Sequence, residues 1–167
     1  RAGDIVAVGG ESVPNHVAYV VRVDVNSGLI GGMPQGGAVF GVPSQSDVEF
    51  FFSAIELANP AETGPNGWQN IVIVGQYSSG SDIYVVKLID GDPMGAGLSE
   101  PVERLIGLPV GQDIEWGTDV VEIDNSANMA PLNPWDLVIT GTHDDPTTGD
   151  PGELLLLAVN GGTLVPM

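Results

Sequence analysis

The stretch Ile5-Val-Ala-Val-Gly9 occurs twice more, as Ile71-Val-Ile-Val-Gly75 and as Leu137-Val-Ile-Thr-Gly141. Each copy begins 66 residues after the one before it. Runs of Val and Ile that end in Gly are typical of β-strands. A fixed spacing of this kind predicts an internal repeat, and the repeat decides the fold class.

A second strand-like run follows each copy, and the segments between the copies also match at the same spacing. The second runs are Ala18–Asp24, Ile83–Ile89 and Glu153–Val159. The matched segments include Gly41-Val-Pro43 with Gly107-Leu-Pro109, and Asp47-Val-Glu-Phe50 with Asp113-Ile-Glu-Trp116. Two further strands per repeat are expected, near Val39 and Leu105, and from Val48 and Ile114. The chain therefore reads as two repeats of four strands and half of a third.

The fourth strand of each repeat carries a predicted irregularity. Apolar residues alternate through Val48, Phe50 and Phe52 and then move to the other parity. A β-bulge near Ser53 explains the shift, and the matching residues predict a second bulge near Asp119. No segment shows a sustained helical period, so little helix is expected.

These patterns predict one all-β domain over residues 1–167, with repeats at about 5–70 and 71–136 and a half repeat at 137–167. About ten strands result. One architecture is a β-sandwich or barrel built from the duplicated four-strand repeat. The alternative is a β-propeller-like module or fragment, in which each four-strand repeat forms a blade.

The run Tyr19-Val-Val-Arg-Val-Asp-Val-Asn-Ser-Gly28 resembles blade strands of secreted bacterial β-propeller repeats, where a strand ending in Asp leads into a short turn before Gly. Residues Ile83 to Asp92 are a looser match. The resemblance implies a blade-like repeat and an exported protein. Two and a half blades cannot close a propeller, so the β-sandwich remains the other predicted architecture.

The amino-acid composition limits the classes of molecule that the chain is expected to bind. The chain has 22 acidic and four basic residues, a formal net charge of −18. Phosphate binding needs Lys and Arg, so nucleic acid and anionic membrane surfaces are poor partners. The chain has no Cys, which excludes disulfides and thiolate metal sites. No apolar run reaches the ~20 residues of a membrane span.

Acidic turns are candidate Ca²⁺ sites, because Ca²⁺ takes oxygen ligands from closely spaced Asp and Asn. The candidate ligands are Asp24, Asn26, Asp90, Asp92, Asp144 and Asp145. The twelve-residue EF-hand pattern is absent. Asp and Asn are also common turn residues without any metal.

Two other groups suggest catalysis. The pairs Asp47/Glu49 and Asp113/Glu115 place two carboxylates on one strand face, roughly 6.5–7 Å apart by the strand rise, as glycoside hydrolysis requires. A solvated strand face explains each pair better, and a divalent-ion site is the other alternative. The two imidazoles, His16 and His143, lie between the first and second strands of different repeats. They are read either as a base or metal ligand, or as polar loop residues.

Three tryptophans complete the candidates. Trp68 and Trp135 precede the second and third copies and could bind a glycan or partner as stacking platforms, or else seal the repeat core. Trp116 matches Phe50 and is expected in the core.

Three functions remain open. The first is a non-enzymatic structural or assembly protein, outside the cell or at its surface, that self-associates through β-strand edges. The second is a glycan- or ligand-binding module. The third is a hydrolase fragment with paired carboxylates. The chain begins at Arg1, which fits processing. The apolar run Leu154–Leu157 is expected to be buried on both faces, so that self-pairing or assembly must cover it.

Overall fold

A computed structural model describes residues 5–11, 17–23, 38–40, 50–65, 67, 69–77, 82–89, 102–106, 114–124, 135–144 and 152–167. All ten expected strands lie within these ranges. They are β1 Ile5–Glu11, β2 Val17–Val23, β3 Ala38–Phe40, β4 Phe50–Glu56, β5 Ile71–Tyr77, β6 Asp82–Leu88, β7 Val102–Ile106, β8 Ile114–Asp124, β9 Trp135–Asp144 and β10 Glu153–Asn160. The all-β prediction is confirmed.

The strands form three separate antiparallel sheets. Sheet 1 has the order β1-β2-β3, sheet 2 the order β4-β5-β6-β7, and sheet 3 the order β8-β9-β10. Spatial order follows chain order in every sheet, so each sheet is a simple meander. The described strands do not close into one barrel, because no ladder joins one sheet to another.

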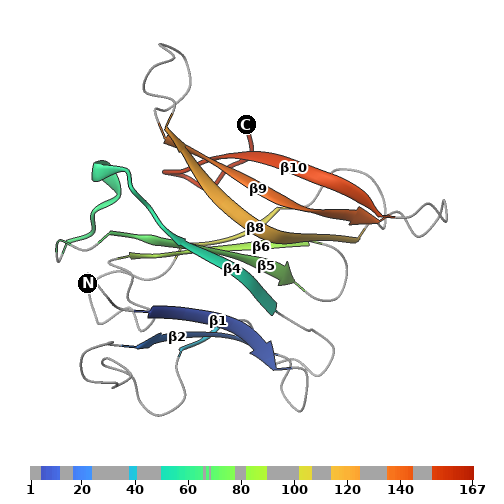
Figure 1. The fold of residues 1–167 in the computed structure, drawn as a ribbon, viewed down its shortest axis with the longest axis horizontal. Helices are drawn as coiled ribbons and strands as arrows, with labels where there is room; N and C mark the ends of the chain where they lie inside the picture. The colour runs from blue at the N-terminus through green and yellow to red at the C-terminus, as the bar shows by residue number, and fades with distance from the viewer. Residues whose placement is uncertain are drawn as a thin grey trace.

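The three sheets stack face to face, with sheet 2 in the middle, as Figure 1 shows. A lower core between sheets 1 and 2 contains Val20 from β2 and, from sheet 2, Phe51, Ile71, Ile73, Tyr84, Val86 and Leu88. An upper core between sheets 2 and 3 contains Leu57, Val72, Val74, Ile83, Val85, Ile106, Val120, Leu137, Ile139, Val159 and Leu164. Both faces of sheet 2 are therefore buried. This explains why β5 and β6 are almost continuously apolar.

Both predicted bulges are present. The β4–β5 register shifts between Phe51 and Ser53, and the β8–β9 register shifts between Gly117 and Asp119. The second shift lies 66 residues after the first. In each case one extra residue bends the strand and changes which side chains face the core.

The bulge also corrects the expected burial of the aromatic residues. Phe51 is buried in the lower core, whereas Phe52, which was expected to share the apolar face with Phe50, is about half exposed at 48%. The rings of Phe50 and Phe52 stack with centroids 6.4 Å apart. Simple alternation fails here because Phe52 is the extra residue of the bulge, which the β4–β5 ladder leaves unpaired between Phe51 and Ser53.

The expectation that Trp116 lies in the core is wrong. Trp116 is half-buried and pairs with Thr142, whose other ladder partner is the exposed Leu154. These residues share the face of sheet 3 that points away from sheet 2. Phe50, at the matching position, pairs with Gln76, whose other partner is Ile83 in the upper core. Within the described residues no further sheet covers the side of sheet 3 that carries Trp116.

Burial of Leu154–Leu157 on both faces is also wrong. Leu155 and Leu157 pack against the upper core, but Leu154 is 77% exposed and Leu156 is 64% exposed. Sheet 3 is the top of the stack, so alternate residues of β10 face outward.

Helical structure is sparse, as expected. A 3₁₀ turn at Pro60–Glu62 follows β4, and the Asn59 side chain caps it by accepting a hydrogen bond from the Ala61 N–H at 2.9 Å. Within the described ranges, no helix is long and apolar enough to cross a membrane.

Candidate functional site

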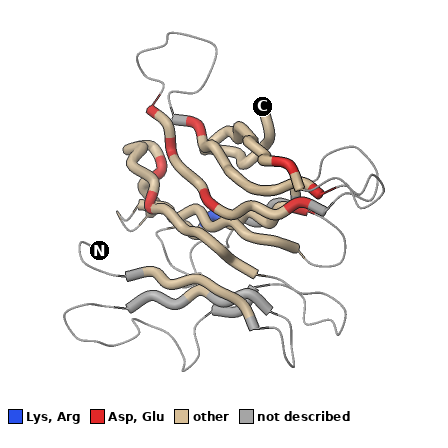
Figure 2. Tube along the Cα trace, turned by 45° about the vertical axis from the view of Figure 1, so that its right-hand side comes forward, with Lys and Arg blue, Asp and Glu red and all other residues tan. Residues whose placement is uncertain are grey.

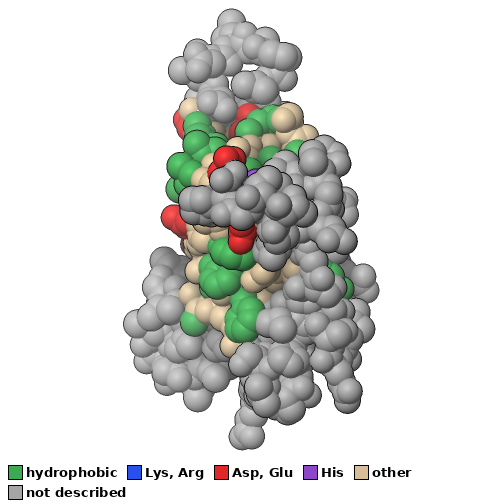
Figure 3. All heavy atoms as spheres, turned by 90° about the vertical axis from the view of Figure 1, so that its right-hand side faces the viewer, with side chains coloured by type: hydrophobic (Ala, Val, Ile, Leu, Met, Phe, Trp, Pro, Cys, Tyr) green, Lys and Arg blue, Asp and Glu red, His purple; other side chains and the backbone are tan. Residues whose placement is uncertain are grey.

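Among the described residues, the most distinctive surface is the outward side of sheet 3. It carries Val121 and Ile123 from β8, Val138 and Thr140 from β9, and Leu154 and Leu156 from β10; we call these six positions the outer face. Four of the six are large apolar side chains with exposures from 39% at Ile123 to 77% at Leu154. Figure 3 shows hydrophobic side chains reaching the described surface toward the top of the stack, beside acidic ones.

The outer face corresponds, position by position, to a buried face of sheet 2. The side of sheet 2 that packs on sheet 3 is formed by Ile55, Leu57, Val72, Val74, Ile83 and Val85. The residues 66 positions after the first four are Val121, Ile123, Val138 and Thr140. The last two match by ladder rung, because Val85 pairs with Val74 as Leu156 pairs with Thr140. The outer face therefore has the composition of an interface between stacked sheets.

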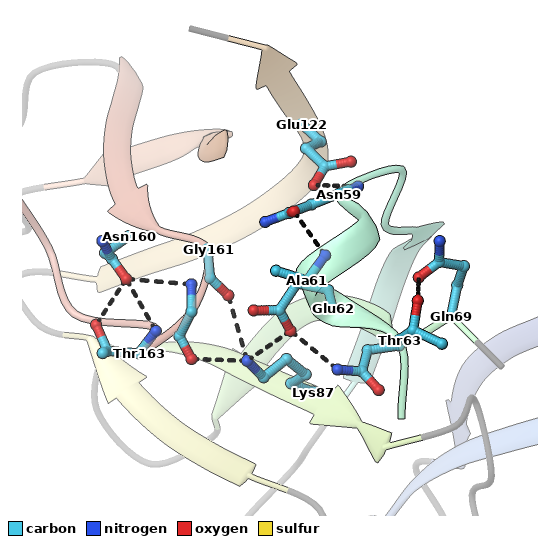
Figure 4. A network of polar contacts seen from close by, with 12 residues as sticks. Asn59, Ala61, Glu62, Thr63, Gln69, Lys87, Glu122, Asn160, Gly161 and Thr163 are labelled. Carbon is cyan, nitrogen blue, oxygen red and sulfur yellow. Dashed lines mark hydrogen bonds and ion pairs between the residues drawn. The ribbon is translucent and has the colours of Figure 1, made fainter. Parts of the chain in front are cut away.

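A polar network ties the other side of sheet 3 to sheet 2 (Figure 4). Lys87, on β6, is only 5% exposed, and its Nζ lies 3.1 Å from Oε2 of Glu62. The same ammonium donates to the carbonyl oxygens of Gly162 at 2.7 Å and Gly161 at 3.3 Å, in the turn that follows β10. The Asn70 side chain donates to Glu62 Oε2 at 2.9 Å. Because a buried charge is costly unless it is paired, these contacts help to hold sheet 3 on sheet 2.

Two shorter polar motifs flank the network. Asn160 Oδ1 accepts hydrogen bonds from the Gly162 and Thr163 N–H groups, which shapes the turn after β10. Glu122 of β8 accepts from the backbone N–H groups of Ala58 and Asn59, which join sheet 3 to the segment after β4. These contacts hold the layers together. Figure 2 shows the acidic positions along the strands of sheets 2 and 3.

Two catalytic candidates lie together in the structure, one from the carboxylate pairs and one of the two imidazoles. Glu115 and His143 are direct cross-strand partners, and Glu115 Oε1 lies 3.4 Å from His143 Nδ1. Glu153 is the next residue on the same rung. The Glu115 side chain is only 2% exposed and His143 is half-buried. The sequence predicted neither the burial nor the pairing, because the two residues are 28 positions apart on different strands.

The remaining candidates lie outside the described residues, apart from two. Those outside are Asp24, Asn26, Asp90, Asp92, Asp145, His16, Asp47, Glu49, Asp113 and Trp68. Asp144 is half-buried at the end of β9, opposite Ile114 in the ladder. Trp135 opens β9 opposite Asp124. Among the residues whose placement is described, no group of three His, Asp or Glu side chains is arranged to hold a metal ion. The Ca²⁺ hypothesis stays a prediction.

Comparison with known proteins adds no relative. The sequence matches no protein-family model, and neither the curated proteins nor the solved structures gave a match. Function therefore has to be argued from the sheets themselves.

Proposed function

We propose that this chain is a non-enzymatic structural module whose repeated sheets stack, like the blades of a β-propeller, onto those of further copies. The acidic composition, and the resemblance of the run Tyr19–Gly28 to secreted bacterial repeats, support a location outside the cell or at its surface. The supporting observation is the outer face: exposed apolar residues stand where sheet 2 has its buried interface with sheet 3. Exposed apolar patches of this kind mark interaction sites.

The internal repeat supports the same proposal. The two bulges, at Phe51/Ser53 and at Gly117/Asp119, occur at equivalent places in β4 and β8. Sheets 2 and 3 both use the odd positions of their central strands, such as Ile73 and Ile139, to pack on the sheet before them. A repeat that stacks by one rule within the chain can continue by the same rule between chains.

The occupant of the outer face is then sheet 1 of a second copy. Val6 and Val8 of β1 pack on the lower core, so the alternate residue Ala7 faces away from sheet 2 and is exposed. Ala7 is the counterpart of Ile73 and Ile139, which face the preceding sheet. The two ends of the stack are therefore unlike, and Ala7 and the outer face correspond to the two sides of an interface within the chain. Contacts between unlike surfaces give a ring when the rotation closes and a filament when it does not.

Light scattering with a single charge substitution tests this function. We expect the intact chain to show masses above 17.3 kDa that rise with protein concentration, in moderate salt that screens the net charge of −18. Leu156→Glu is expected to return the mass to that of the monomer, because a carboxylate would have to be buried in the interface.

The matched control is Ala61→Glu, which adds one negative charge at an exposed residue of the 3₁₀ turn. It should assemble as the unaltered chain does. A chain that stays monomeric at every concentration, or a Leu156→Glu variant that assembles normally, would contradict the proposed function.

A further inference from the structure

The three glycines that end the repeated Val-rich strands have different surroundings. A Cβ atom built on Gly75 would lie 1.7 Å from the carbonyl oxygen of Phe50, and one built on Gly141 would lie 2.1 Å from the carbonyl oxygen of Trp116. Neither glycine can carry a side chain, because the backbone of the bulged neighbouring strand occupies that space. Gly9 is the third member, and within the described residues no atom lies within 4 Å of a Cβ built on it.

The position of Gly9 in its sheet explains the difference. β5 has β4 on one side and β6 on the other, and β9 lies between β8 and β10. β1 is the edge strand of sheet 1, with β2 on one side. Gly75 and Gly141 pair with residues of the bulged strand, Phe51 and Gly117, on the side where β1 has its edge.

We propose that the edge of β1 binds an antiparallel strand that carries a β-bulge opposite Gly9. This strand addition goes beyond the stacking function proposed above. It rests on that function in one respect only: both are routes by which the chain assembles. Main-chain hydrogen bonds to an exposed edge supply affinity in such complexes, and the side chains that fit the edge supply specificity. Gly9 is the specificity element, since a residue without a side chain at this position leaves room for the close approach of a bulged backbone.

The ladder also indicates which residue the bound strand presents. Gly75 pairs with Tyr84 on one side and Phe51 on the other, and the rings of Phe51 and Tyr84 stack with centroids 5.3 Å apart. An aromatic ring thus covers the glycine between them. Gly9 pairs with Tyr19 in β2. The fitting partner is an extended segment of the β4 type, with an aromatic residue opposite Gly9 and one extra residue immediately after it.

A labelled peptide with the sequence of residues 47–58 is the probe, titrated into the intact chain and followed by fluorescence anisotropy. It contains the aromatic pair partner of Gly75 and the bulge residue Phe52. We expect saturable binding in moderate salt, which screens the repulsion between the acidic peptide and the acidic chain. The same peptide lacking Phe52 should bind about tenfold more weakly or worse, because without the bulge one half of the strand presents the wrong face.

Substitution of the edge completes the test. Gly9→Val should lower peptide affinity by a similar factor while leaving the thermal melting of the chain unchanged or raised, because its side chain fills open space. Ala7→Val, two residues away on the same face of β1, is the matched control and should bind the peptide normally. Absence of binding, or equal binding by Gly9→Val and the unaltered chain, would overturn the inference. Because the peptide assay follows the labelled peptide rather than the mass of the chain, it can fail while the mass measurement on the outer face succeeds, and the reverse.

Discussion

Replacing Gly75 with Ala is expected to lower the free energy of unfolding by about 4 kcal/mol or more, in the range reserved for the most damaging single substitutions. The new methyl group would stand 1.7 Å from the carbonyl oxygen of Phe50, which is a backbone atom and cannot turn aside as a side chain can. The bulged strand would have to move away, which breaks the β4–β5 ladder and disturbs Phe51 in the lower core. Chemical denaturation with circular dichroism measures the loss.

The three related glycines supply the controls. Gly141→Ala should be nearly as damaging, because its methyl group would lie 2.1 Å from the Trp116 carbonyl oxygen. Gly9→Ala should be neutral or should stabilise the fold by about 0.5–1 kcal/mol, since Ala loses less backbone entropy than Gly in a strand. Equal losses in all three variants would contradict the assignment of the close approach to the bulges.

Lys87→Met is expected to cost about 3–5 kcal/mol of stability, the usual penalty for removing one partner of a buried ion pair. The substitution keeps most of the side-chain volume but leaves the Glu62 carboxylate, whose side chain is 12% exposed, without its cation. It also removes the donor to the Gly161 and Gly162 carbonyl oxygens, so the turn after β10 loses its tie to sheet 2.

A double variant separates charge from packing. Lys87→Met combined with Glu62→Leu removes both charges, and it should be more stable than Lys87→Met alone, because no buried charge remains without a partner. Equilibrium unfolding of the two single variants and the double variant completes the cycle. Simple addition of the two single losses would contradict an ion pair that couples the two residues.

The sequence was sufficient to predict the positions of the strands and of the two bulges. Both are local patterns: strands follow from Val- and Ile-rich runs between turn residues, and each bulge follows from a shift of apolar parity before Ile55 and before Val121. Which strands share a sheet depends on pairing between segments that are far apart in the sequence, and local patterns do not reveal that pairing. The chain could therefore be read as a closed sandwich or as blades, and the described strands form three stacked meanders.

Burial was harder to predict, because it depends on how many faces of a sheet are covered. Phe51 is buried because a sheet lies over its face, whereas Leu154 and Leu156 are exposed because sheet 3 is at the top of the stack. The polar contacts were also hidden from sequence reasoning. Lys87 and Glu62 are 25 residues apart, and Lys87 and Gly162 are 75 apart. Close backbone approach did leave a signal in the sequence: a glycine stands at the same place in all three copies, and at Gly75 and Gly141 a neighbouring backbone lies against it.

Cross-linking between copies tests the central claim, that sheet 1 of one copy stacks on the outer face of another. In the interface between sheets 2 and 3, Val74 and Ile139 both lie against Gly117, within 3.5 Å of a Cβ built on it. Their counterparts at the two ends of the stack are Thr140 and Ala7. The chain has no Cys, so Thr140→Cys and Ala7→Cys each introduce a single thiol.

The two variants are mixed, treated with a short thiol-specific cross-linker and separated by mass. Head-to-tail stacking predicts a cross-linked dimer that joins one copy of each variant, with a yield far above that from either variant alone. Adding Leu156→Glu to the Thr140→Cys chain should abolish that dimer. Equal yields from the mixture and from each variant alone, or no cross-link at concentrations where the mass exceeds 17.3 kDa, would contradict the stacking of sheet 1 on the outer face.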